Sequence, residues 1–100
     1  MLYIQKKQEG DALTVTLEGH VDTNTAPKLK KEVEPLLAGI SRLNLDFEKV
    51  DYISSAGLRV LTVFEQIMEE QDKPMELIHV SEIIRNVLDV TGFLDVLTVI

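Results

Sequence analysis

The chain has 100 residues, of which 45% are hydrophobic and 27% charged, a composition typical of one globular domain over residues 1–100. Its net charge of −7, from 17 acidic and 10 basic side chains, argues against nucleic-acid binding, which needs clustered Lys and Arg. The absence of cysteine excludes disulfides and thiolate metal sites, and no apolar run suits a signal peptide or a membrane span, so we expect a cytoplasmic protein that does not bind membranes.

The first twenty residues predict a β-hairpin. Leu2 to Ile4 and Leu13 to Leu17 are expected to be strands, because apolar and polar side chains in the second segment alternate as in a half-buried sheet. The sequence Glu9-Gly10-Asp11 supplies a turn between them. Gly19 is expected to end the second strand.

A helix is predicted after the hairpin. It starts near Thr23-Asn24-Thr25, whose side chains can cap the first turn, and it continues toward Gly39. Pro27 is tolerated in the first turn, but Pro35 removes one backbone hydrogen bond and clashes with the preceding turn. We therefore expect a kink or an early end near Glu34.

Strands and helices alternate through the rest of the chain. The predicted elements are a strand at 43–47, a helix at 56–70, a strand at 75–80, a helix between Ser81 and Gly92, and a short last strand at 96–99. This alternation indicates parallel crossovers, while the opening hairpin makes the sheet mixed. We expect a single α/β domain with a mixed four- to five-stranded sheet and three to four helices.

The stretch from Val50 to Arg59 joins the third predicted strand to the second long helix. It holds two adjacent hydroxyls, Ser54 and Ser55, where that helix should begin. Such a position suits an N-cap, and it also suits a phosphate, because free N–H groups and the helix dipole face it. From these residues alone, a cap is the simpler interpretation.

Two side chains in the first turn of this helix have open roles. On an ideal helix Leu58 lies away from the apolar face formed by Val60, Phe64 and Ile67. It is therefore either a partner contact or a residue that the geometry of the first turn buries. Arg59 either meets an acidic partner or is a solvated surface residue.

Motifs for catalysis are scarce. His20 and His79 have no recognisable motif around them and are expected to be structural. The sequence Ser54-Ser55-Ala56-Gly57 is not a G-x-S-x-G elbow, and no S-x-x-K pair includes either serine. A serine-nucleophile enzyme would need a base close to Ser55, and the sequence offers no obvious one. We therefore expect a protein that is not an enzyme and needs no cofactor.

Three aspartates, Asp22, Asp46 and Asp51, are each predicted at or just after a strand end. Ligands collect at this edge of open α/β sheets, and carboxylates there can bind magnesium. The simpler interpretation makes Asp46 and Asp51 solvated loop residues, whereas for Asp22 a turn residue and a functional residue are equally good interpretations. Because metal-ligand spacings such as H-E-x-x-H are missing, we predict no metal site.

Two blocks of the sequence resemble one family. Ile53-Ser54-Ser55-Ala56-Gly57-Leu58, which follows a Leu-x-Leu-x-Phe strand, resembles the signature of STAS-domain anti-sigma factor antagonists. The segment from Leu17 to Ala26 is similar to the family's L-x-G-x-(L/V)-D-x-x-(T/S)-A block. The blocks stand in the family's order, and the resemblance extends to a closing helix followed by Gly92-Phe93. It implies a single STAS-like domain over residues 1–100.

The resemblance also implies a function. Proteins of this family bind an anti-sigma factor that is also a serine kinase, and so free a sigma factor for transcription. The kinase phosphorylates a serine at the start of the helix after the third strand, which breaks the complex, and a PP2C-type phosphatase reverses it. Weak nucleotide binding is compatible with the resemblance. The alternative on the same fold is a non-phosphorylated STAS adaptor in a transport or stress-signalling assembly.

Aligning Gly57-Leu58 with the family's Gly-Leu places Ser55 on the phosphoacceptor. Ser54 then stands where many members have an aspartate, and this departure keeps Ser54 as the second choice. The resemblance implies a partner-binding surface made of Asp22, Thr23, Ser54, Gly57, Leu58 and Arg59.

Overall fold

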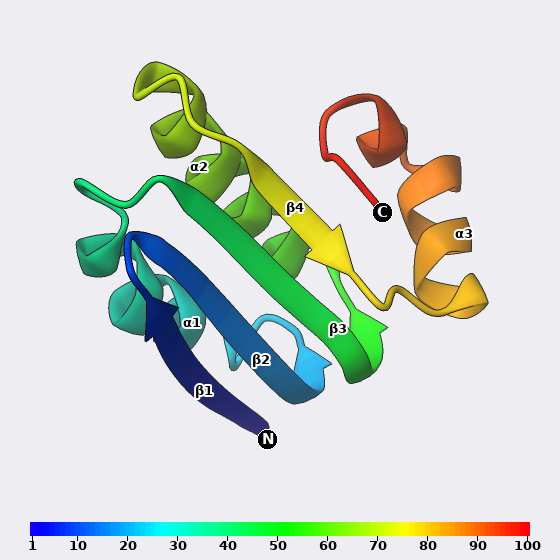
Figure 1. Cartoon of the computed structure of the whole chain (residues 1–100). Coiled ribbons are helices and arrows are strands. Elements are labelled where there is room, and N and C mark those ends of the chain that lie inside the picture. The colour runs from blue at the N-terminus through cyan, green and yellow to red at the C-terminus, as the bar shows by residue number, and fades with distance from the viewer.

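Four strands lie side by side in the order β1-β2-β3-β4 in the computed structural model, which describes residues 1–100. Helices α1 and α2 cover one face of this sheet, and α3 lies beside the β4 edge (Figure 1). The elements are β1 Leu2–Glu9, β2 Ala12–Val21, α1 Ala26–Val33, β3 Arg42–Ile53, α2 Ser55–Glu70, β4 Met75–Ile78 and α3 Glu82–Val90, with 3-10 helices η1 at Glu34–Leu36 and η2 at Phe93–Asp95.

The sheet is mixed, as predicted. β1 and β2 form an antiparallel hairpin whose turn contains Gly10 at φ +61°, and β2, β3 and β4 are parallel. The predicted end of β2 at Gly19 was wrong, because the strand continues to Val21 through an irregular step with register shifts on either side of Gly19. Gly19 has φ +117°, and a Cβ there would lie 2.3 Å from the carbonyl oxygen of Met1. The glycine therefore marks a bulge inside the strand.

The predicted effect of Pro35 is confirmed. Helix α1 ends at Val33, and the chain tightens into the 3-10 helix η1, which contains the proline. Ser81 also caps α3 as predicted, since its Oγ accepts a hydrogen bond from the N–H of Ile84 at 3.2 Å. Each of these features is decided by residues within one helical turn.

The predicted strand at 96–99 is not a full strand. Helix η2 takes up Phe93–Asp95, and the residues after it make only an isolated parallel bridge between Leu77 and Val99. Two backbone hydrogen bonds hold this segment, from Leu77 N–H to Thr98 O at 2.8 Å and from Ile100 N–H to Leu77 O at 3.0 Å. The sheet therefore has four strands.

One hydrophobic core of 25 buried residues lies between the sheet and the helices. Alternate residues of β2 and β3 enter it, as the period-two pattern predicted. The apolar face of α2 is rotated from the predicted one, because Leu61 and Met68 are fully buried beside Phe64 while Ile67 is only half-buried. No helix has the length and apolar character needed to cross a membrane.

Candidate functional site

Strands β2 and β3 end side by side, at the edge where their connections lead into α1 and α2 (Figure 1). Val21 at the end of β2 pairs with Ile53 at the end of β3. The N–H of Ser54 then donates to the carbonyl oxygen of Val21 at 2.9 Å. Asp22 and Ser54, which are 32 positions apart in the sequence, therefore leave the sheet from adjacent strand ends. The structure thus brings the two sequence blocks together at one edge.

Gly57 lets α2 approach this edge closely. A Cβ at position 57 would lie 2.7 Å from both Cγ1 and the carbonyl oxygen of Val21, and 2.9 Å from Cγ1 of Ile53. These separations are shorter than real carbon contacts allow, so only glycine fits while the helix keeps its position. The absence of a side chain here places the first turn of α2 directly against the end of β2.

The two serines have different surroundings. Ser54 is the N-cap of α2, with φ −101° and ψ 175°, and its Oγ accepts a long hydrogen bond of 3.5 Å from the N–H of Gly57. Ser55 is the first residue of the helix and is exposed, and its hydroxyl has no hydrogen-bond partner within the chain. Ser54 therefore has a capping role, whereas the hydroxyl of Ser55 is accessible from solvent.

Asp22 organises the turn that leads into α1. Its Oδ1 accepts hydrogen bonds from the N–H groups of Asn24 at 2.9 Å and Thr25 at 3.0 Å. The Thr25 hydroxyl donates to the carbonyl oxygen of His20 at 2.7 Å and lies 3.2 Å from the same carboxylate oxygen. Desolvation raises the pKa of Asp22, but the hydrogen bonds from Thr25 and Asn24 outweigh it and hold the pKa below its ordinary value. Asp22 is therefore an ionised turn residue.

The other residues of the predicted partner-binding surface differ in how far they are buried. Thr23 and Arg59 are exposed, and Ser54 is half-buried. Gly57 is buried, and Leu58 is only 2% exposed. Of the two interpretations of Leu58, the structure therefore supports burial, because Leu58 lies on the same buried face of α2 as Leu61 and Met68. A surface that a partner touches directly would be formed by Asp22, Thr23, Ser54, Ser55 and Arg59.

Each histidine pairs with an aspartate of β3. His20 Nδ1 lies 2.5 Å from Oδ1 of Asp51, and the His20 ring meets Tyr52 edge to face at 6.3 Å. His79 Nδ1 lies 3.0 Å from Oδ1 of Asp46. Sequence reasoning missed these pairs, whose members are 31 and 33 positions apart. The register that places His20 opposite Tyr52 is the signal that would reveal the first pair.

The geometry gives no support to a magnesium site or to a serine nucleophile. Asp22, Asp46 and Asp51 are each engaged separately, and no group of three or more His, Cys, Asp or Glu side chains is placed to hold a metal ion. No imidazole, amine or carboxylate is hydrogen-bonded to the Ser55 hydroxyl, which a nucleophile with an adjacent base would need.

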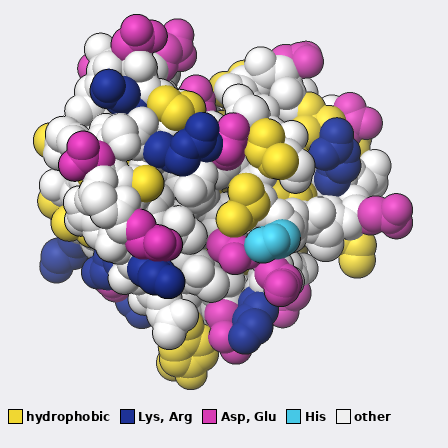
Figure 2. All heavy atoms as spheres, viewed as in Figure 1, with side chains coloured by type: hydrophobic (Ala, Val, Ile, Leu, Met, Phe, Trp, Pro, Cys, Tyr) yellow, Lys and Arg dark blue, Asp and Glu magenta, His cyan; other side chains and the backbone are white.

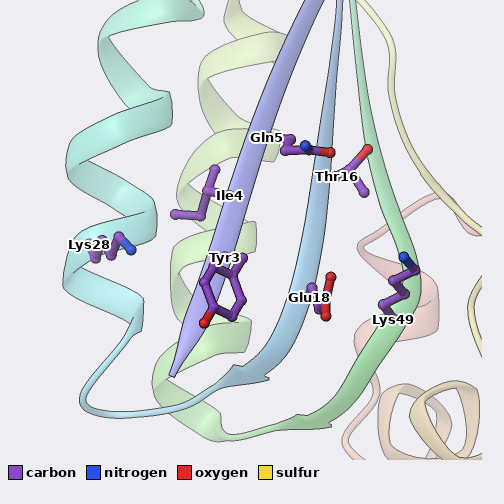
Figure 3. A pocket seen from close by; sticks show the side chains of 7 residues that line it. All are labelled: Tyr3, Ile4, Gln5, Thr16, Glu18, Lys28 and Lys49. Atoms are coloured by element: carbon purple, nitrogen blue, oxygen red, sulfur yellow. The ribbon is translucent and has the colours of Figure 1, made fainter.

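The pocket in Figure 3 is lined by side chains of β1, β2 and β3 together with Lys28 of α1. It has a volume of about 420 Å³, and Tyr3, Gln5, Thr16, Glu18 and Lys49 contribute polar groups from three strands on the sheet face opposite the core. Acidic and basic side chains are mixed over the face seen in Figure 2, and acidic ones gather toward the ends of β2 and β3. The pocket therefore offers a polar, mixed-charge surface without a recognisable catalytic group.

Comparison with known proteins identifies relatives over nearly the whole chain. The family model described as "Mlab, STAS domain" matches residues 4–98. The anti-sigma-B factor antagonist of Bacillus subtilis strain 168 is 26% identical over 96 residues, which cover 96% of this chain and 88% of that protein. BtrV of Bordetella bronchiseptica, assigned as an anti-sigma factor antagonist, is 32% identical over 88 residues, covering 87% of this chain and 76% of that protein.

Solved structures share the fold at low identity. A Thermotoga maritima protein assigned as an anti-sigma factor antagonist gives a TM-score of 0.89 at 19% identity, covering 96% of this chain and 84% of that one. The anti-sigma factor antagonist SpoIIAA in its unphosphorylated form gives a TM-score of 0.77 at 13% identity, covering 98% of this chain and 87% of that one. The phosphorylated form of SpoIIAA from Bacillus also gives a TM-score of 0.77, at 14% identity, covering 98% of this chain and 91% of that one.

Replacing Gly57 with alanine should move the first turn of α2 away from β2. The new Cβ would meet the carbonyl oxygen of Val21, a backbone atom that cannot rotate aside, so we expect a loss of about 1–3 kcal/mol in the free energy of unfolding. Urea unfolding measures the loss, and NMR shifts of the Asp22 and Ser54 amides report the movement. The matched control is Ser55→Ala at an exposed position, expected within about 0.5 kcal/mol of the unmodified chain. Equal stability of both variants would contradict this account of Gly57.

The His79–Asp46 pair should make stability depend on pH. The hydrogen bond that the His79 ring donates to Asp46 and the charge of Asp46 raise the pKa of His79, the charge of Glu48 adds to this, and desolvation opposes it less strongly. A raised folded-state pKa stabilises the fold fully below the unfolded value of about 6.5, and the contribution is lost as pH rises through the folded pKa.

His79→Gln should therefore destabilise the protein more at about pH 5.5 than at about pH 8.5. Denaturant unfolding at the two pH values measures this difference, and an NMR titration of the His79 ring measures the pKa directly. Asp46→Asn is the control, because it should return the His79 pKa toward its ordinary value. A His79 pKa that Asp46→Asn leaves unchanged would refute the assignment of the cause.

Proposed function

The chain belongs to the STAS-domain family of anti-sigma factor antagonists, and from that premise we propose that it binds a kinase-type anti-sigma factor and thereby releases a sigma factor for transcription. Phosphorylation of Ser55 by the same kinase ends the interaction. A PP2C-type phosphatase removes the phosphate and restores binding. The observation that carries this proposal is the exposed Ser55 hydroxyl, free of hydrogen bonds, at the first position of α2.

The first turn of α2 suits a phosphate at Ser55. A phosphoserine adds roughly −1.5 to −2 charges and three strong acceptor oxygens near neutral pH. Free N–H groups at the start of a helix and the helix dipole favour such a charge by about 0.3–1 kcal/mol. Ser55 is exposed and its hydroxyl makes no hydrogen bond within the chain, so the modification displaces no packed side chain. The fold is therefore expected to persist after phosphorylation, and the phosphate weakens the binding of the partner.

A phosphate at the centre of a protein interface is costly. The γ-phosphoryl group of ATP moves to Ser55 Oγ, the bond to the β-phosphate oxygen breaks, and the serine proton passes to a base that the kinase supplies. The product then carries two negative charges against a surface that had packed around a neutral hydroxyl. Desolvating those charges without new partners opposes binding strongly, which accounts for release.

Ser54 supports the choice of Ser55 as the acceptor. Serine and aspartate are both good N-caps, because each side chain accepts a hydrogen bond from an N–H in the first turn. Ser54 makes such a bond with Gly57, so it does the structural work that an aspartate would do at this position. Ser54 stays the second choice, because a phosphate there would have to replace the cap.

A non-phosphorylated adaptor is the second candidate function. The departure that favours it is the serine at position 54, where many relatives that are phosphorylated have an aspartate. An adaptor would use the same edge of the sheet to hold a subunit of a transport or stress-signalling assembly. It would co-purify stably with that subunit and would not be phosphorylated.

Phosphorylation can be tested with the purified chain, ATP and each kinase-type anti-sigma factor from the same genome. Intact-mass spectrometry should show the gain of about one phosphate, because one hydroxyl at the start of α2 is accessible. Ser55→Ala should abolish the gain, and Ser54→Ala should keep it.

Two results would change the assignment. Labelling that survives Ser55→Ala but disappears in Ser54→Ala would move the phosphoacceptor to Ser54. Stable co-purification with an ATPase or a scaffold, together with no labelling by any of the kinases, would favour the adaptor.

A further inference from the structure

Arg59 is an unpaired cation beside the candidate phosphoacceptor. It is exposed on α2, and none of the six ion pairs in the structure includes it. It lies four residues after Ser55, and side chains at this helical spacing are neighbours with Cβ atoms about 5–6 Å apart. Ser55 and Arg59 therefore share the side of α2 opposite the buried residues Leu61 and Phe64.

No acid within one turn of Arg59 on α2 can pair with it. The residues three and four positions away are Ala56 and Ser55 before it, and Thr62 and Val63 after it. The aspartates near the ends of β2 and β3 have other partners, since Asp22 accepts N–H groups of its own turn and Asp51 contacts His20. In a chain with 17 acidic and 10 basic side chains, a free guanidinium at this surface is complementary to a carboxylate on another protein.

We propose that the anti-sigma factor and the phosphate of Ser55 compete for Arg59. In the unmodified chain, Arg59 binds an Asp or Glu carboxylate on the anti-sigma factor. In the phosphorylated chain, it binds the phosphate one turn away. This inference rests on the proposed function, and it makes Arg59 a residue that determines which partner is bound and when.

The competition favours the phosphate for physical reasons. The guanidinium fork matches carboxylate and phosphate oxygens equally well, so geometry does not decide between them. The phosphate carries more charge than a carboxylate and is attached to the same helix, so its pairing costs no association entropy. The partner's carboxylate loses its cation and faces a new negative group. Attraction at this contact therefore becomes repulsion.

Partner affinity tests the first half of the proposal. Isothermal titration with the anti-sigma factor that labels the chain should show binding weaker by about thirtyfold or more for Arg59→Ala, the scale expected for truncating one member of a desolvated charge pair. Arg85→Ala is the matched control, because Arg85 is also exposed on a helix and also lacks an ion pair. Its affinity should stay within about twofold of the unmodified chain.

The phosphate itself tests the second half without any partner. Phosphoserine can be installed at position 55 by genetic encoding, and ³¹P NMR then follows its second ionisation, whose ordinary pKa is about 6. A neighbouring guanidinium favours the dianion, so the pKa should be lower in the chain with Arg59 than in Arg59→Ala. Arg85→Ala should titrate like the unmodified phosphoprotein.

The outcomes separate this inference from the proposed function. Equal affinity of Arg59→Ala and the unmodified chain, with Ser55 still labelled, would overturn the inference and leave the proposed function intact. An equal loss of affinity for the anti-sigma factor in Arg59→Ala and Arg85→Ala would also overturn the inference. So would a phosphate pKa that Arg59→Ala leaves unchanged. Failure of the unmodified chain to bind any kinase-type anti-sigma factor of its genome would overturn both.

Discussion

The absence of a side chain at position 57 is the constraint on which the candidate functional edge of the sheet depends. The first turn of α2 lies so close to the end of β2 that a single Cβ would overlap the backbone of Val21. With the helix held there, the N–H of Ser54 reaches the carbonyl oxygen of Val21. The start of α2 and the start of the turn at Asp22 then become one surface. A larger residue at 57 would separate the two blocks without changing any residue that a partner touches.

A second glycine brings β2 to this edge for a different reason. Gly19 has a positive φ and almost no space beside the backbone of Met1, so it allows an irregular step without ending the strand. The register shift there lets Val21 pair with Ile53, two residues beyond the point where a regular strand was expected to stop. Asp22 consequently leaves the sheet beside Ser54. The position of the site thus depends on two glycines. Gly57 allows α2 to approach the end of β2 closely, and Gly19 adopts the positive φ that the irregular step in β2 requires.

Features governed by neighbours in the sequence were predictable, whereas features governed by packing were not. The hairpin turn at Gly10, the early end of α1 before Pro35 and the Ser81 cap all follow from local backbone chemistry. Leu58 shows the limit of such reasoning, because an ideal helical wheel assumes one buried face. The buried face of α2 is rotated toward Leu58, Leu61 and Met68, so a residue on the expected polar side is buried. The His–Asp pairs depend on strand register, which the sequence pattern alone does not define.

The serine at position 54 changes the electrostatics of the proposed switch. It keeps the capping hydrogen bond to Gly57 but adds no charge, and the first turn of α2 contains no acidic residue. Within the start of α2, Arg59 then makes the charge positive before modification, and a phosphate at Ser55 would bring it to roughly −0.5 to −1. The ionised Asp22 at the end of β2 adds a negative charge to the same surface in both states. An aspartate cap would have neutralised the start of α2 beforehand, and the phosphate would then have made this segment negative without reversing its sign. Reversal of sign at the Arg59 contact discriminates more sharply, because a partner carboxylate that pairs with Arg59 in the unmodified chain is repelled by the phosphate in the modified one. The departure at Ser54 and the cation at Arg59 are therefore parts of one electrostatic arrangement.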